Sequence, residues 1–359
     1  MKAENNEGLK VYNRYVGRKR VALLVVLIVT LLVALYSIGI GSISIPISEI
    51  FKVLTGGGEA MYRTAVLNIR LPRAVTAIVV GAALAAAGAV MQCVLRNPLA
   101  SASSRGVSQG AACGAALGIV VFGGGVVNSA NATTAITINN PYIVTICAFV
   151  FGIVSTVVIV MISQLKKNVG PAGLILAGTA MSSLFSGAST ILQYFADDTK
   201  LGAIVFWTFG NLGSTSWREL LILTVVFLAA MFYFMLNRWN YNAMESGADT
   251  AKSLGVNTRA VMLVSMGICS LLAAVAVSFC GIISFVGLVA PHIMRRFVGN
   301  DYRYLVPGSA IAGATLLILA DLVSRTVMAP VILPIGALTS FLGAPVFLFL
   351  LFRGGKNNG

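Results

Sequence analysis

Long stretches without charged residues are the feature that most constrains how this chain can fold. A helix needs about 20 apolar residues to cross a bilayer, and a charge at its centre costs a few kcal/mol. No Lys, Arg, Asp or Glu occurs in Val21–Ser48, Ala74–Leu95, Gly106–Leu165, Asn168–Ala196, Leu220–Asn237, Ala260–Met294, Tyr304–Ala320 or Thr326–Phe352. Charged residues make up 10% of the chain, against about 25% in soluble domains. The sequence therefore predicts an all-α, polytopic membrane protein.

The membrane domain is expected to cover residues 21–353, with a short tail at each end, 1–20 and 354–359. Polar or proline-containing segments divide the longer stretches, so about ten helices are predicted. Their expected ranges are 20–40, 71–95, 104–123, 141–163, 170–195, 217–237, 258–280, 284–297, 304–326 and 335–353.

The distribution of basic residues predicts the orientation in the membrane. If the N-terminus is cytoplasmic, 18 of the 25 Lys and Arg residues fall on the cytoplasmic side and the other seven fall outside. This excess agrees with the positive-inside rule and predicts that both termini are cytoplasmic. The expected location is the inner or plasma membrane of the cell. The net charge of +14 therefore reflects membrane topology and does not indicate nucleic-acid binding.

Two spans carry residues in a helical pattern. Glycines recur every four residues from Gly106 to Gly118, which predicts close packing against a neighbouring helix. On the fifth span, polar residues recur at steps of three and four. They are Thr179, Ser182, Ser186, Ser189 and Gln193. This stripe is expected either to line a hydrated pathway or to form hydrogen bonds with neighbouring helices.

The longest polar segment between cytoplasmic span ends predicts a short helix over about 242–255. Asn242 and Glu245 have the spacing of a capping box, and Gly255 is suited to the end of a helix. A helix in this position is expected to dock a cytoplasmic partner. No phosphate-binding loop or nucleophile motif occurs, and the only histidine, His292, has no carboxylate cluster beside it. No catalytic residue, metal ligand or cofactor site is therefore assigned to this chain.

Several segments together resemble the permease subunits of ABC importers for iron–siderophores, haem and vitamin B12. The resemblance covers the chain from the first span to Arg353, and its motifs occur in the family's order. They are Arg70-Leu71-Pro72-Arg73, Arg96-Asn97-Pro98-Leu99-Ala100, GVSQGA from Gly106, LILAGTAMSSL from Leu174, FWTFGNL from Phe206, GIISFVGLVAPHIMRR from Gly281 and LPIGALTSFLGAPVF from Leu333.

The resemblance implies a fold like that of the vitamin B12 permease and a non-enzymatic role in ATP-driven import. A second permease subunit, identical or a close paralogue, two cytoplasmic ATPases and an extracytoplasmic binding protein are implied, with ATP and Mg²⁺ bound by the ATPases. The expected cargo is an iron chelate, a ferric siderophore first, with haem and cobalamin as alternatives. The alternative function is a secondary, ion-coupled transporter, but Asp321 is the only acidic residue well inside a predicted span.

The resemblance also implies roles for individual residues. The binding protein would dock on Arg70, Arg73 and Arg325, although Arg70 and Arg73 could instead anchor their helix at the lipid headgroups. ATPase coupling would involve Glu245, Gly247, Ala248, Ala251, Leu254 and Gly255. The polar stripe on the fifth span would line the pathway. Asp321 and Arg325 are four residues apart and are expected to pair on one helix face.

Overall fold

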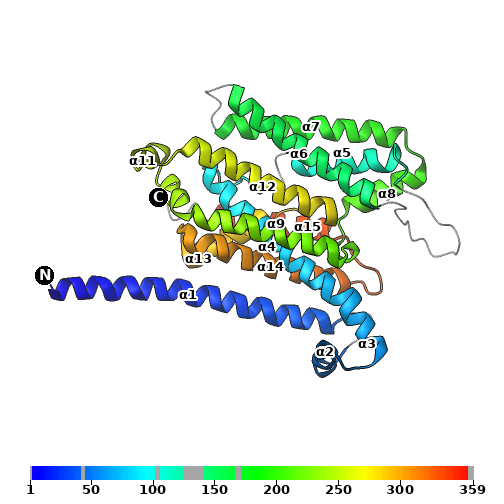
Figure 1. Ribbon diagram of the computed structural model, residues 1–359, viewed down its shortest axis with the longest axis horizontal. Helices are drawn as coiled ribbons and strands as arrows, with labels where there is room; N and C mark the ends of the chain where they lie inside the picture. The colour runs from blue at the N-terminus through cyan, green and yellow to red at the C-terminus, as the bar shows by residue number, and fades with distance from the viewer. Residues whose placement is uncertain (1, 42–44, 102–105, 125–140, 166–170, 355–359) are drawn as a thin grey trace.

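The computed structural model describes residues 2–41, 45–101, 106–124, 141–165 and 171–354 and is helical almost throughout (Figure 1). No β-strand occurs in these ranges, which confirms the predicted all-α fold. The longer helices are α1 (Lys2–Gly39), α4 (Leu71–Val94), α5 (Val107–Val120), α6 (Pro141–Leu165), α7 (Pro171–Tyr194), α9 (Trp217–Leu236), α12 (Thr258–Cys280), α13 (Val286–Val298), α14 (Tyr302–Thr326) and α15 (Ile335–Gly354). The shorter helices are α2 (Ile47–Leu54), α3 (Ala60–Thr64), the π-helix η1 (Ala65–Arg70), α8 (Asp198–Thr208), the 3₁₀-helix η2 (Leu212–Ser214), α10 (Arg238–Glu245) and α11 (Ala248–Ser253).

Each of the ten predicted spans contains a helix, but the helices differ in length. Seven helices in the described part of the chain are long and apolar enough to cross a membrane. The other three are shorter: α5 has 14 residues, α13 has 13 residues, and the apolar part of α15 covers Ile335–Phe349. The expected count of about ten membrane-spanning helices is therefore approximate. Helix α1 also begins well before residue 20, whereas the tail at 355–359 lies outside the described residues.

Helix α4 forms the centre of the bundle because its small residues allow neighbouring backbones to approach closely. Its most apolar window is 89% buried, the largest fraction among the candidate spans. A Cβ atom added at Gly81 would overlap the backbone of Gly313 on α14, and one at Gly88 would overlap the backbone of Gly287 on α13. Without a hydrophobic driving force in lipid, such close contacts stabilise helix pairs through van der Waals packing.

The regular glycines of α5 pack as the sequence predicts. A Cβ atom at Gly114 would overlap the carbonyl of Cys147 on α6, and one at Gly110 would lie 2.7 Å from the carbonyl oxygen of Phe151. The close-packing prediction is confirmed, and α6 is the partner helix.

The outer helices present apolar side chains to the surroundings. On α1, for example, Leu31 is 59% exposed and Leu32 is 61% exposed, and only 22% of this helix's most apolar window is buried. Figure 1 shows α1 along one edge of the bundle and α5–α8 along the opposite edge. The start of α1 and α11 lie toward one end of the bundle, and α2, α3 and α8 lie toward the other (Figure 1).

Candidate functional site

The three arginines expected to dock a binding protein lie together where α1 ends. Arg73 Nε donates a hydrogen bond to Asp321 Oδ1 at 2.7 Å, and Arg325 Nε donates one to Oδ2 at 2.9 Å. Asp321 is only 1% exposed. The predicted pairing of Asp321 with Arg325 is confirmed. Sequence reasoning missed the second partner, Arg73, because it lies 248 positions away in the chain.

Arg70 and Arg325 also bind the C-terminal end of α1. Arg70 Nη1 donates to the carbonyl oxygens of Ile38 and Gly39, both at 2.9 Å. Arg325 donates to the carbonyl oxygen of Ile40 at 2.9 Å and to Ser37 Oγ at 2.6 Å. The last carbonyls of a helix lack partners within it and form the negative end of its dipole. The guanidinium groups therefore satisfy these carbonyls and connect α1 to η1 and α14.

This group of Arg70, Arg73, Arg325 and Asp321, the arginine cluster, is positively charged overall. Its three guanidinium groups and one carboxylate give a formal charge of +3 − 1 = +2. The arginines are oriented toward protein groups, and Arg73 is only 9% exposed. Arg70 and Arg325 are half-buried, so the cluster is not fully covered by protein. The docking role remains a prediction.

The polar stripe of α7 does not occupy a uniform environment. Thr179 and Ser186 are exposed, Ser182 and Gln193 are half-buried, and Ser189 is buried. Three of the hydroxyl groups donate to carbonyls of their own helix. They are Thr179 (Leu176, 2.8 Å), Ser182 (Gly178, 3.0 Å) and Ser189 (Phe185, 2.8 Å). Such bonds satisfy a hydroxyl donor without a neighbouring helix.

Sequence reasoning also missed part of the exposed polar face of α7. Ser183 and Thr190 are exposed, and Thr190 Oγ1 donates to the carbonyl of Ser186 at 3.0 Å. Their helical spacing from Thr179 and Ser186 was a usable signal. The exposed face therefore combines residues from the predicted stripe with others outside it.

The expected helix over 242–255 is two helices in the structure. α10 ends at Glu245, and α11 begins at Ala248, with Gly247 between them at a φ of +126°. Ala251 is fully buried, whereas Leu254 is 68% exposed. The segment therefore presents an apolar side chain at the end of the bundle where α11 projects in Figure 1.

Gly255 ends α11 as the sequence predicts. Its amide donates to the carbonyl of Lys252 at 2.9 Å, and the amide of Val256 donates to the carbonyl of Ala251 at 3.0 Å. These two bonds define a Schellman motif, which requires a left-handed residue at this position. Gly255 has a φ of +83°, a conformation that glycine adopts without steric cost.

The predicted capping box of Asn242 and Glu245 is wrong. Asn242 lies inside α10, and its Oδ1 accepts a hydrogen bond from the backbone amide of Tyr302 at 2.7 Å. It therefore caps α14, a helix 60 residues further along the chain. Glu245 accepts hydrogen bonds from Asn300 Nδ2 at 2.9 Å and from the Tyr302 hydroxyl at 3.2 Å. Local spacing suggested a cap within one helix, but tertiary packing brings the start of another helix to the same side chains.

Asp301 contacts charged and polar side chains from α1, α10 and α14. It forms a salt bridge with Arg303 at 2.7 Å and a longer one with Lys19 of α1 at 3.7 Å, and it accepts a hydrogen bond from Asn242 at 3.1 Å. Burial by itself would raise the pKa of Asp301, but the hydrogen bonds from Arg303 and Asn242 outweigh this effect and lower the pKa to about 2. The carboxylate is therefore ionised at neutral pH and holds α1, α10 and α14 together.

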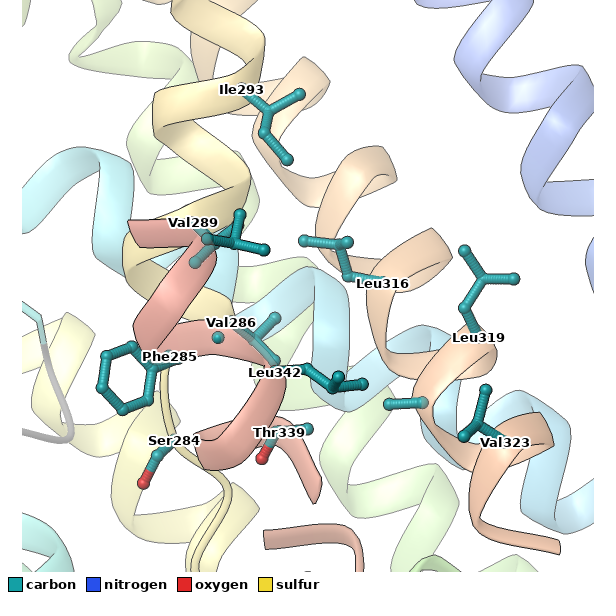
Figure 2. Close-up of a pocket in the computed structure, with 13 residues that line it drawn as sticks. Ser284, Phe285, Val286, Val289, Ile293, Leu316, Leu319, Val323, Thr339 and Leu342 are labelled. Atoms are coloured by element: carbon teal, nitrogen blue, oxygen red, sulfur yellow. The ribbon is translucent and has the colours of Figure 1, made fainter. Parts of the chain in front are cut away.

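A separate cavity of about 190 Å³ lies between α13, α14 and α15 (Figure 2). Figure 2 shows Val289, Leu316 and Leu342 around it, with hydroxyl groups only on Ser284 and Thr339. An iron chelate carries many polar groups, and specific ligand sites provide several polar partners for such groups. The cavity has the wrong chemistry for a chelate.

Comparisons with known proteins agree with this architecture. Residues 27–353 match the FecCD transport family. The chain is 48% identical over 342 residues to MJ0087 of Methanocaldococcus jannaschii, which carries the name of an ABC transporter permease, with 95% of this chain and 97% of that protein covered. It is 36% identical to the hemin transport system permease protein HmuU of Yersinia pestis, with 91% and 94% covered.

A vitamin B12 permease and a solved transporter structure are also similar to this chain. The vitamin B12 import system permease protein BtuC of Vibrio vulnificus is 32% identical, with 94% of this chain and 95% of that protein covered. A solved structure, described as an inward-facing ABC transporter of the metal-chelate type, superposes with a TM-score of 0.80 at 31% identity and covers 92% of this chain and 98% of that one. This chain therefore belongs to the FecCD transport family of ABC transporter permeases.

Proposed function

We propose that this chain is the membrane permease of an ATP-driven importer that moves an iron chelate, a ferric siderophore first, into the cytoplasm. Members of its family are transporter subunits and not enzymes, so ATP hydrolysis is assigned to two separate cytoplasmic ATPases. The observation that carries the proposal is the family match over residues 27–353, which includes nearly the whole membrane domain. Haem and cobalamin are the alternative cargoes, because named relatives transport hemin and vitamin B12.

The proposed ATPase-docking surface is α10–α11 with the turn that follows. Its residues are Glu245, Gly247, Ala248, Ala251, Leu254 and Gly255. The exposed Leu254 supports this assignment, since a large apolar side chain at the edge of a membrane bundle is suited to a groove on a partner. Gly247 and Gly255 fix the direction of α11 at its two ends through backbone conformations that favour glycine.

The proposed binding-protein surface is the arginine cluster, at the opposite end of the molecule from α11. Its formal charge of +2 supports attraction of acidic side chains on a partner. Arg73 and Arg325 are bound to Asp321. We therefore propose that they contribute to docking mainly through the positive potential and the shape of this surface. This role predicts docking that weakens as ionic strength rises.

The proposed translocation pathway runs between two permease subunits, with α7 along its wall. The exposed Thr179 and Ser186 support this assignment, because a hydrated pathway requires polar groups that are not covered within one subunit. Ser182, Ser189 and Gln193 are more buried and would support the wall from behind.

The proposal is tested by purification followed by transport. The tagged chain should co-purify with an ATPase, and the complex in proteoliposomes should take up radiolabelled ferric hydroxamate when a binding protein and ATP are supplied. Hemin and cyanocobalamin serve as the two alternative probes. Uptake by the chain alone, driven by a proton gradient without ATP, would instead establish a secondary transporter. Cysteine labelling from either side of intact cells would test the cytoplasmic placement of both termini.

A further inference from the structure

One hydroxyl group connects the proposed ATPase-docking segment with the buried centre of the bundle. Tyr302 is fully buried at the start of α14. Its hydroxyl donates to Glu245 Oε2 on α10 at 3.2 Å and accepts from Arg295 Nη2 on α13 at 3.4 Å. A phenolic hydroxyl has one donor and can accept as well, so this arrangement uses both of its capacities.

Arg295 continues the connection into α4. Its Nη1 donates to Gln92 Oε1 at 2.5 Å, and Gln92 Nε2 reaches the carbonyl oxygen of Gly287 at 3.4 Å. Gln92 is only 3% exposed, and it is a polar residue in a helix that is otherwise almost entirely apolar. Buried polar groups of this kind need their partners, because an unpaired one is costly.

These four residues, Glu245, Tyr302, Arg295 and Gln92, form a continuous polar chain across α10, α14, α13 and α4. The start of α14 is also held to α10 by the bond from its first backbone amide to Asn242. We propose that Tyr302 is a positioning residue of the transport cycle, which transmits displacement of α10 to α13 and α4 through this polar chain. The inference rests on the proposed function, because it assumes that an ATPase moves α10–α11.

Mechanical transmission requires both a connection and a stiff element beyond it. The polar chain supplies the connection. The stiff element is the contact of α4 with α13, where the backbones at Gly88 and Gly287 approach too closely to accept a Cβ atom. Well-packed elements of this kind shift as units and do not deform continuously. A displacement delivered to Gln92 would therefore move α4 and α13 together.

The test compares two tyrosines that differ in their hydroxyl partners. Tyr302→Phe removes the hydroxyl, with its bonds to Glu245 and Arg295, but keeps the ring. Tyr241→Phe is the matched control: Tyr241 is also fully buried, its ring lies 5.9 Å from that of Tyr302, and its hydroxyl bonds with Ser265 on α12 at 2.9 Å, outside the polar chain. Both variants are assembled with the co-purified ATPase, and chelate uptake per ATP hydrolysed is measured in proteoliposomes with radiolabelled ferric hydroxamate, hemin and cyanocobalamin as probes.

Tyr302→Phe should retain the ATPase and hydrolyse ATP within about twofold of wild type, while uptake per ATP falls about fivefold or more. Tyr241→Phe should keep the wild-type ratio. An unchanged ratio in Tyr302→Phe, or an equal fall in both variants, would overturn the inference. If Tyr302→Phe does not assemble, Arg295→Lys decides by the same criterion, since lysine keeps the charge but lacks the fork that reaches two partners. Wild-type protein without ATPase binding or ATP-driven uptake would refute the proposed function itself.

Discussion

Replacing Asp321 by asparagine would remove the only carboxylate of the arginine cluster with almost no change in volume. Asp321 is 1% exposed, and its two oxygens accept hydrogen bonds from Arg73 at 2.7 Å and from Arg325 at 2.9 Å. Asparagine presents an amide nitrogen in place of one of these oxygens. At least one guanidinium group would therefore face a donor, and both would lose the opposite charge.

The expected loss of stability follows from this burial. Removing one partner of a buried ion pair costs about 3–5 kcal/mol, because the remaining charge stays buried without compensation. Here two arginines lose the same partner, and Arg73 has an exposure of only 9%. We expect a loss near the upper end of that range, which corresponds to a decrease of more than a thousandfold in the ratio of folded to unfolded protein.

The assay is reversible unfolding of the purified protein in mixed micelles by added SDS, followed by tryptophan fluorescence. The matched control is Asp249→Asn on α11. This substitution is chemically identical, but the side chain is 99% exposed and lies 3.4 Å from Lys252. Exposed pairs contribute little, so the control should unfold as wild type does. Adding Arg73→Gln to Asp321→Asn should recover part of the loss, because it removes one of the unpaired charges.

Equal unfolding curves for Asp321→Asn and Asp249→Asn would refute the reasoning. Such a result would mean that water reaches the cluster and screens its charges in the membrane protein. A double variant less stable than Asp321→Asn alone would also contradict it, since it would show that Arg73 stabilises the bundle through its carbon stem and not through the ion pair.

Three further predictions follow from close packing, backbone conformation and charge. Gly88→Ala should destabilise the bundle by about 2 kcal/mol or more in the same SDS titration, because its Cβ atom would overlap the backbone of Gly287. The control is Gly267→Ala on α12, where a Cβ atom would have nothing within 4 Å, and it should be neutral or stabilising. Gly255→Ala should cost about 1 kcal/mol from its φ of +83° and should weaken retention of the ATPase in pull-down measurements, unlike Ser253→Ala in the same helix. The pKa of Asp301 is about 2 when folded and about 4 when unfolded, so its stabilising contribution is complete above about pH 4 and is lost as the pH falls toward 2. Thermal unfolding from pH 6 to pH 2 should therefore show a smaller acid-induced loss for Asp301→Asn than for wild type, and parallel curves would contradict this assignment.

Features that depend on local spacing could be predicted from the sequence. The charge-free stretches contain the long helices, the glycines of α5 contact α6, and Gly255 ends α11. Asp321 and Arg325 pair across one helical turn. Each of these signals lies within a single element, where residues three or four positions apart share a face.

Features that depend on tertiary contact could not be predicted in this way. From its position in the sequence, Arg73 could anchor its helix at the lipid headgroups, yet in the structure it is buried against Asp321. Asn242 has the position of a cap for its own helix, yet it caps α14. Replacing Arg70, Arg73 and Arg325 by glutamate would appear from the sequence to be a surface change, whereas the structure predicts loss of the bonds to Asp321 and to the end of α1. In each case the partner comes from a distant part of the chain and leaves no periodic signal.

The two charged regions at opposite ends of the bundle involve the same two helices. α14 is next to Asp301 at its start and carries Asp321 near its end, while α4 carries Arg73 near its start and Gln92 near its end. Between these ends, the backbones of the two helices touch at Gly81 and Gly313, where no side chain is available to yield. Bending the pair would break these contacts, so a rigid displacement is the less costly response to a load at either end. The α4–α14 pair is therefore suited to move as one body during transport, with its ends fixed by different sets of ionic contacts.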